Sequence, residues 1–166
     1  MSGLDEKLAH VRLAAFDIDG VFTDGRFYLS DEGVESKAFN TQDGFGIRQL
    51  LGANIAVAVI SGRSSGAVTR RMNELGVPHV VQGCKDKVAA LNSIIESLGL
   101  TAHECAYVGD DLPDLPLLDH VGVSIAVANA VETLRARCDI TTAAAGGAGA
   151  VREVCDLLLS KRGNAA

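Results

Sequence analysis

Short apolar runs rich in valine, isoleucine and alanine recur along the chain and alternate with stretches of helical pattern. Most of these runs do not alternate polar and apolar residues, which is typical of strands buried on both faces of a parallel sheet. Strands that alternate with helices predict a doubly wound α/β fold with a mainly parallel sheet. We expect strands at 13–16, 55–60, 79–81, 105–108, 123–128 and 139–141, and helices at 43–52, 64–75, 86–98, 112–118, 130–136 and 148–160.

One segment interrupts this alternation. Residues 21–40, "VFTDGRFYLSDEGVESKAFN", contain turn residues at "SDEG" and predict a β-hairpin that projects from the sheet after the first strand. The chain has 166 residues, which suits one domain, 1–166, and leaves no room for a separate cap domain. The glycine-rich segment 141–150, "TTAAAGGAGA", is expected to be a loop before the last helix.

Composition and charge limit the partners. The formal net charge of −6 argues against a nucleic-acid-binding surface. No apolar run reaches the roughly 18 residues of a membrane span, and the first ten residues, "MSGLDEKLAH", lack the apolar core of an export signal. We therefore expect a cytoplasmic protein without membrane contacts. The spacing of the cysteines matches no zinc or redox motif, so we expect packed, reduced thiols at Cys84, Cys105, Cys138 and Cys155.

Polar side chains follow four of the predicted strands. The carboxyl ends of parallel strands lie at one edge of the sheet, and open α/β sheets bind ligands at that edge. Each group alone is weak support for a site, but their joint placement is hard to obtain by accident. The groups are Asp17 and Asp19 after the first strand, Ser61, Gly62 and Arg63 after the second, Lys85 and Lys87 after the third, and Asp110, Asp111 and Asp114 after the fourth.

Clustered carboxylates become stable when they hold a hard cation, and Mg²⁺ takes oxygen ligands while it contacts substrate phosphate. Asp17 and Asp110 are the natural protein ligands. The chain has no EF-hand loop, Walker A loop or GxGxxG motif, so we do not expect a nucleotide-cradling site. An aspartate beside Mg²⁺ can attack phosphorus to form an aspartyl-phosphate. Asp19 can then act as general acid and base, and Ser61 and a lysine can donate to the phosphoryl oxygens.

The same residues resemble the motifs of the haloacid dehalogenase-like phosphohydrolases. DxD matches Asp17 and Asp19, the strand-end hydroxyl matches Ser61, and GDDxxD matches residues 109–114. The resemblance implies a Rossmann-like domain with a Mg²⁺ cofactor, in which Asp17 is the nucleophile and a metal ligand. It further implies that Asp19 is the general acid/base and contacts the metal through its carbonyl, that Asp110 is the third metal contact, that Ser61 and Lys87 bind the phosphoryl group, and that Asp111 and Asp114 lie behind the metal ligands.

The resemblance covers roughly residues 10 to 160 and is strongest to a capless group of this superfamily. It implies a phosphatase for an eight-carbon sugar acid phosphate used in lipopolysaccharide biosynthesis. It also implies a homotetramer in which neighbouring subunits complete each active site. The implied substrate contacts are Asp19, Asn40, Thr41, Gln42, Asp43, Gly44, Arg48, Gly62, Arg63, Arg71 and Lys87.

Several alternatives stay open. A sister group acts on a nine-carbon, sialic-acid-type phosphate, but it typically has an acidic residue where this chain has Arg63. A non-catalytic assembly domain of the same fold could dispense with Asp17 and Lys87, which are both present here. Arg71 lies either on a solvated helix face or in a neighbour's site. The segment 141–150 is either a plain connector or a closing element.

Overall fold

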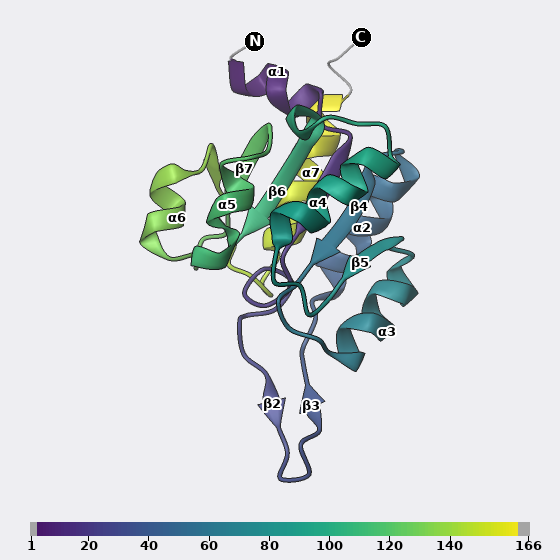
Figure 1. Ribbon diagram of the computed structural model, residues 1–166. Helices are drawn as coiled ribbons and strands as arrows, with labels where there is room; N and C mark the ends of the chain where they lie inside the picture. The colour runs from purple at the N-terminus through teal and green to yellow at the C-terminus, as the bar shows by residue number, and fades with distance from the viewer. Residues whose placement is uncertain (1–2, 163–166) are drawn as a thin grey trace.

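The structure, a computed structural model, describes residues 3–162 and contains a six-stranded parallel sheet (Figure 1). The strand order is β5-β4-β1-β6-β7-β8, so the direction of winding reverses between β1 and β6. The predicted doubly wound α/β fold is therefore confirmed. The strands are β1 (Leu13–Phe16), β4 (Ala56–Ile60), β5 (His79–Val81), β6 (Cys105–Gly109), β7 (Val123–Ala126) and β8 (Ile140–Thr141).

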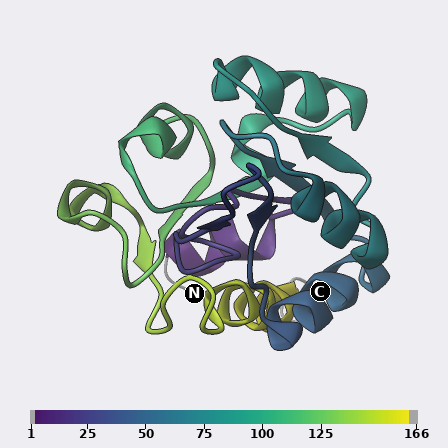
Figure 2. The same ribbon diagram turned by 90° about the horizontal axis from the view of Figure 1, so that it is seen from below.

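Helices cover both faces of the sheet, with α2 and α7 packed together on one side and α4 and α5 on the other (Figure 2). The helices are α1 (Gly3–Ala9), α2 (Thr41–Gly52), α3 (Gly66–Leu75), α4 (Lys87–Ser97), α5 (Leu115–Leu118), α6 (Glu132–Arg137) and α7 (Ala150–Arg162), with 3₁₀ turns at Ala102–Glu104 and Leu112–Asp114.

Two helical regions differ from the sequence prediction. The helix expected at 112–118 is split into a 3₁₀ turn and the short α5, because Pro113 and Pro116 lack the amide hydrogens that a continuous helix uses. Helix α1 was not expected, since only Leu8 of its seven residues is buried and so short a segment shows no apolar stripe.

The central strands are buried on both faces, which explains why their sequences do not alternate. Every side chain of β1 and of β6 is buried. Phe22, in the loop after β1, packs edge to face against Phe16 with ring centroids 5.5 Å apart. This contact anchors the loop that carries Asp17 and Asp19 to the core.

The predicted hairpin is also present. Strands β2 (Tyr28–Leu29) and β3 (Glu35–Ser36) pair antiparallel. The hairpin projects from the lower edge of the sheet, opposite the two termini (Figure 1). The turn closes where Gly33 N donates to Ser30 O at 2.9 Å. Tyr28, Leu29 and Val34 expose most of their side-chain surface.

No helix within residues 3–162 is both long enough and apolar enough to cross a membrane. The four cysteines are free thiols, of which Cys105 and Cys155 are buried. Burial raises the pKa of Cys105 to about 12, so this thiol stays protonated and packs as a small apolar side chain. Residues 1–2 and 163–166 of the predicted domain lie outside the described residues.

Candidate active site

Asp17 and Asp110 converge at the point where the sheet reverses its winding. Asp17 directly follows β1, and its amide still bonds to Val108 O of β6 at 3.0 Å. Asp110 follows β6. Carboxylate oxygens of Asp17, Asp110 and Asp114 all lie within 4.8 Å of one another. The convergence expected from the sequence is thus present.

A cavity of about 310 Å³ opens over these carboxylates, a size suited to a small polar ligand. It gathers residues from four strand ends, so the joint placement inferred from the sequence holds in space. Gly25 and Pro113 also line it. The predicted residues in its wall are Asp17, Asp19, Ser61, Gly62, Arg63, Lys87, Asp110, Asp111 and Asp114.

The acids are crowded enough to resist ionisation. Burial, followed by the charge of Asp114, raises the pKa of Asp17 to about 7, although Lys87 opposes the rise. Burial and the charges of Asp17 and Asp114 raise the pKa of Asp110 to about 8. A hard divalent cation would relieve this repulsion, and carboxylate oxygens are its preferred ligands. The donor set therefore fits Mg²⁺.

Lys87 stands between two of the acids. It is the first residue of α4, whose cap Asp86 accepts a bond from Ala89 N at 3.0 Å. Its Nζ lies 2.8 Å from Asp114 Oδ1 and 3.3 Å from Asp17 Oδ1. Burial acts to lower the pKa of Lys87, but the charges of Asp114 and Asp17 outweigh it and raise that pKa. The ammonium group stays charged at the floor of the cavity.

Asp114 is fully buried and organises its neighbours. Its Oδ1 accepts from Tyr107 Oη at 2.7 Å and from Lys87, and its Oδ2 accepts from the amides of Asp110 at 3.0 Å and Asp111 at 3.4 Å. Both oxygens are thus engaged by protein donors. Sequence reasoning missed Tyr107, although a hydroxyl inside a fully buried strand needs a partner and could have signalled the contact.

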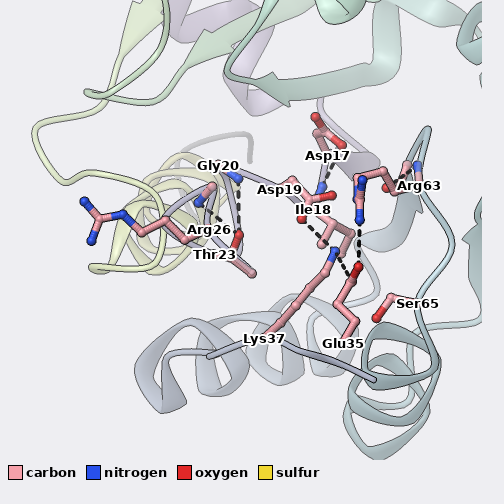
Figure 3. Close-up of polar contacts among 12 residues, drawn as sticks. Asp17, Ile18, Asp19, Gly20, Thr23, Arg26, Glu35, Lys37, Arg63 and Ser65 are labelled. Carbon is pink, nitrogen blue, oxygen red and sulfur yellow. Dashed lines mark hydrogen bonds and ion pairs between the residues drawn. The ribbon is translucent and has the colours of Figure 1, made fainter. Parts of the chain in front are cut away.

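The hairpin reaches the rim of the cavity through charged contacts that the sequence did not indicate. Lys37 Nζ lies 2.6 Å from Asp19 Oδ1, and Arg63 donates to Glu35 Oε2 at 2.6 Å (Figure 3). The Arg63 guanidinium also stacks 4.3 Å from the centroid of the Phe27 ring. These contacts hold the Arg63 side chain beside the acid cluster.

Other predicted substrate contacts lie elsewhere within the single chain. Thr41, Gly44, Arg48 and Arg71 line a separate cavity of about 190 Å³ on α2 and α3. Arg48 donates to Glu74 O at 3.0 Å, and Arg71 pairs with the Glu74 carboxylate at 3.3 Å. These residues are not brought together with the acid cluster.

The start of α2 is tied to the glycine-rich segment 141–150 and to α7. Asn40 accepts from Gln42 N at 2.8 Å as the cap of α2, and its amide donates to Gly147 O at 3.4 Å. Asp43 is buried and accepts from Arg152 N at 2.9 Å. The carboxylate of Asp43 therefore faces α7 and does not line the acid cavity.

The fold is that of a haloacid dehalogenase-like hydrolase, and the family model of that description matches residues 78–153, a range that includes Lys87, Asp110 and Asp114. The 3-deoxy-D-manno-octulosonate 8-phosphate phosphatase KdsC of Salmonella typhi is 48% identical over 157 residues, which cover 95% of this chain and 84% of that protein. The chain belongs to the family of 3-deoxy-D-manno-octulosonate 8-phosphate phosphatases.

Solved structures agree with this placement. The phosphatase of the same name from Yersinia pestis has a TM-score of 0.96 and 41% identity, and the match covers 99% of this chain and 89% of that one. The enzyme from Moraxella catarrhalis, crystallised with a magnesium ion, a phosphate ion and KDO, has a TM-score of 0.95 and 45% identity, with 99% and 94% coverage.

Proposed function

We propose that this protein is a Mg²⁺-dependent phosphatase that converts 3-deoxy-D-manno-octulosonate 8-phosphate to the free sugar acid and phosphate, a step in lipopolysaccharide biosynthesis. The observation that carries the proposal is the meeting of Asp17, Asp110 and Lys87 in one cavity at the switch point. The chain's relationship to phosphatases of that name supplies the substrate.

The proposed metal ligands are the carboxylates of Asp17 and Asp110 and the backbone carbonyl of Asp19. Asp17, Asp110 and that carbonyl would hold Mg²⁺, which when bound neutralises the acids and stabilises charge on the phosphoryl oxygens. Ser61 and Lys87 line the same cavity and would donate hydrogen bonds to those oxygens. These donors would hold the phosphorus against the Asp17 carboxylate.

The reaction then runs in two displacements. Asp17 attacks phosphorus, the bond from phosphorus to the sugar oxygen breaks, and Asp19 gives its proton to the leaving oxygen. A water molecule next attacks the phosphorus of the aspartyl-phosphate and passes its proton to Asp19. The bond between phosphorus and Asp17 breaks, and phosphate leaves with Asp17 and Asp19 restored to their starting states.

Arg63 is proposed to bind the carboxylate or a neighbouring oxygen of the sugar acid, since its guanidinium lines the cavity beside the acids. Gly62 shares that wall. A nine-carbon sugar acid phosphate has the same two anionic groups at a different separation. Comparison of the two substrates therefore tests the proposed length preference.

Phosphate release from the eight-carbon sugar acid 8-phosphate is expected to be lost when a chelator removes the metal and to return when Mg²⁺ is added in excess. The reason is that the Asp17 and Asp110 carboxylates repel both each other and the substrate phosphate. The assay measures kcat/KM for the eight-carbon and nine-carbon phosphates in parallel. If kcat/KM is equal for the two phosphates, or higher for the nine-carbon one, the substrate assignment is wrong. If the enzyme is fully active in chelator, the metal assignment is wrong.

We also propose a cytoplasmic homotetramer in which residues at the second cavity serve the active site of a neighbouring subunit. Three observations support this assembly: the apolar side chains exposed on the hairpin, the exposed Phe45 on α2, and the location of Arg48 and Arg71 outside their own acid cavity. Asn40, Thr41, Gln42 and Gly44 are also proposed for this shared role, whereas the buried Asp43 would serve it by tying the start of α2 to Arg152 of α7.

Mixing two inactive variants tests this assembly. Arg71→Ala and Asp17→Asn are each expected to be inactive or strongly impaired. Mixed tetramers, formed by co-expression, should regain activity, because some sites then combine an intact Asp17 from one subunit with an intact Arg71 from another. Kinetics and light scattering are measured on the same samples. A monomer in light scattering, or mixed tetramers no more active than the separate variants, contradicts the shared site.

A further inference from the structure

Four charged side chains form a continuous set of contacts between the hairpin and the acid cavity (Figure 3). Lys37 Nζ lies 2.6 Å from Asp19 Oδ1 and 3.4 Å from Glu35 Oε1. Glu35 Oε2 in turn accepts from Arg63 at 2.6 Å. Asp19 and Arg63 line the cavity, whereas Lys37 and Glu35 are absent from its wall. Glu35 of β3 and Lys37 just after it thus contact two side chains that line the cavity.

The Lys37 side chain is only 1% exposed, which is costly for an ammonium group unless it is paired. Burial opposes the ionisation of Glu35, but the hydrogen bond from Arg63 and the charge of Lys37 outweigh it and lower the pKa of Glu35. The set therefore brings two cationic side chains, Lys37 and Arg63, into contact with the carboxyl groups of Asp19 and Glu35. A buried ion pair adds little stability over apolar residues of the same volume, so its stronger effect is to fix geometry.

Asp19 depends on this support. It lies in the loop after β1, and within residues 3–162 no side chain other than Lys37 bonds to its carboxylate. A carboxylate on a loop can rotate among staggered positions, and proton transfer requires it within hydrogen-bond reach of the leaving oxygen. The contact at 2.6 Å removes that freedom.

We propose that Lys37 is a positioning residue that holds Asp19 in place for proton transfer, and that Glu35 links Lys37 to Arg63 so that the hairpin sets both side chains together. This inference rests on the proposed function, in which Asp19 protonates the leaving group. Lys37 acts through Asp19, because its side chain is 1% exposed and does not line the cavity.

The test compares leaving groups. Lys37→Met keeps the length of the side chain and removes its charge, and Lys37→Arg keeps the charge. The matched control is Lys161→Met, which breaks an ion pair of the same 2.6 Å length between Lys161 of α7 and Asp5 of α1. Three substrates are used: the sugar acid phosphate, glycerol phosphate and para-nitrophenyl phosphate. Nitrophenolate leaves without a proton, whereas the two alkyl oxygens need one.

The measured quantity is kcat/KM, which reports the steps up to the first phosphoryl transfer. Lys37→Met is expected to lose about 30-fold or more on both alkyl phosphates and only about three-fold on the aryl phosphate, because general acid catalysis contributes about 10²–10⁴-fold where a proton must be given. Lys37→Arg should recover most of the loss on alkyl phosphates, and Lys161→Met should match the wild type on all three substrates.

A double variant separates positioning from general damage. In an Asp19→Asn background, Lys37→Met should cause no further loss on alkyl phosphates, because the group that it positions is already gone. Equal losses on alkyl and aryl phosphates, or additive losses in the double variant, overturn the inference. If the wild type hydrolyses glycerol phosphate but not the sugar acid phosphate, only the proposed substrate is refuted. The role of Lys37 is then still tested by comparing the losses in kcat/KM on glycerol phosphate and on para-nitrophenyl phosphate. Thermal unfolding confirms that each variant is folded.

Discussion

Replacement of Asp17 by asparagine is expected to abolish phosphate release, with a loss of at least about 10⁴-fold in kcat, because removing a covalent nucleophile removes the reaction path itself. Asparagine keeps the size of the side chain and its bond from Ile18 N, which Asp17 accepts at 2.7 Å. The loss should therefore come from chemistry and not from packing. Steady-state kinetics with the sugar acid phosphate measures it.

The same variant is expected to lose activity but to gain thermal stability. Burial and the charge of Asp114 raise the pKa of Asp17 from 3.8 to about 7 in the folded chain, so keeping this carboxyl in the fold costs progressively more as the pH rises from 3.8, and the cost is complete above a pH of about 7. Above it, and in chelator, Asp17→Asn should unfold at a higher temperature than the wild type. The control is Asp156→Asn, at an exposed residue of α7, which should change neither the activity nor the unfolding temperature much. An Asp17→Asn variant that stays active, or that is less stable under these conditions, contradicts the assigned role.

Gly20→Ala is expected to damage the site through sterics alone. Gly20 has a left-handed φ of +84°, and a β-carbon there would overlap Oδ2 of Asp110. The variant should lose about 2–4 kcal/mol of unfolding free energy, from backbone strain together with overpacking. It should also lose about 10²-fold in kcat/KM, because a displacement of about 1 Å in a catalytic group has that effect.

Gly76→Ala separates the two causes. Gly76 has a similar φ of +76° at the end of α3, but nothing lies within 4 Å of the place where its β-carbon would be. It should lose about 1 kcal/mol from backbone strain and keep its activity. Urea unfolding and Mg²⁺ titrations of activity are compared for both variants. If the two lose the same stability and keep the same Mg²⁺ requirement, Gly20 does not protect the position of Asp110.

The residues that sequence reasoning found are those whose place follows from topology. Asp17 and Asp110 come directly after strands that are buried on both faces, and parallel strands bring their carboxyl ends to one edge. Once β1 and β6 are neighbours, the two carboxylates have to meet. Ser61 and Lys87 follow the next two strands outward, and the same logic brings them into the cavity.

The residues that sequence reasoning missed take their roles from tertiary packing, which no local sequence pattern indicates. Lys37 and Glu35 belong to a hairpin with short strands, where charged residues ordinarily face solvent, and only the contact of Lys37 with Asp19 in the loop after β1 reveals its role. Tyr107 looks like one more bulky member of an apolar strand. Arg48 and Arg71 are the opposite case: the sequence resemblance implies that they contact the substrate, and arginine suits an anionic substrate. Within their own chain they line a different cavity.

Acid quenching of a single turnover tests the central claim most directly. Enzyme in excess over sugar acid phosphate with radiolabelled phosphate is stopped in acid, and its peptides are mapped. The account predicts label on the peptide that contains Asp17, released by hydroxylamine as an acyl phosphate is, and no labelled peptide from Asp17→Asn. Label on a different residue, or unlabelled enzyme throughout a productive turnover, would contradict it.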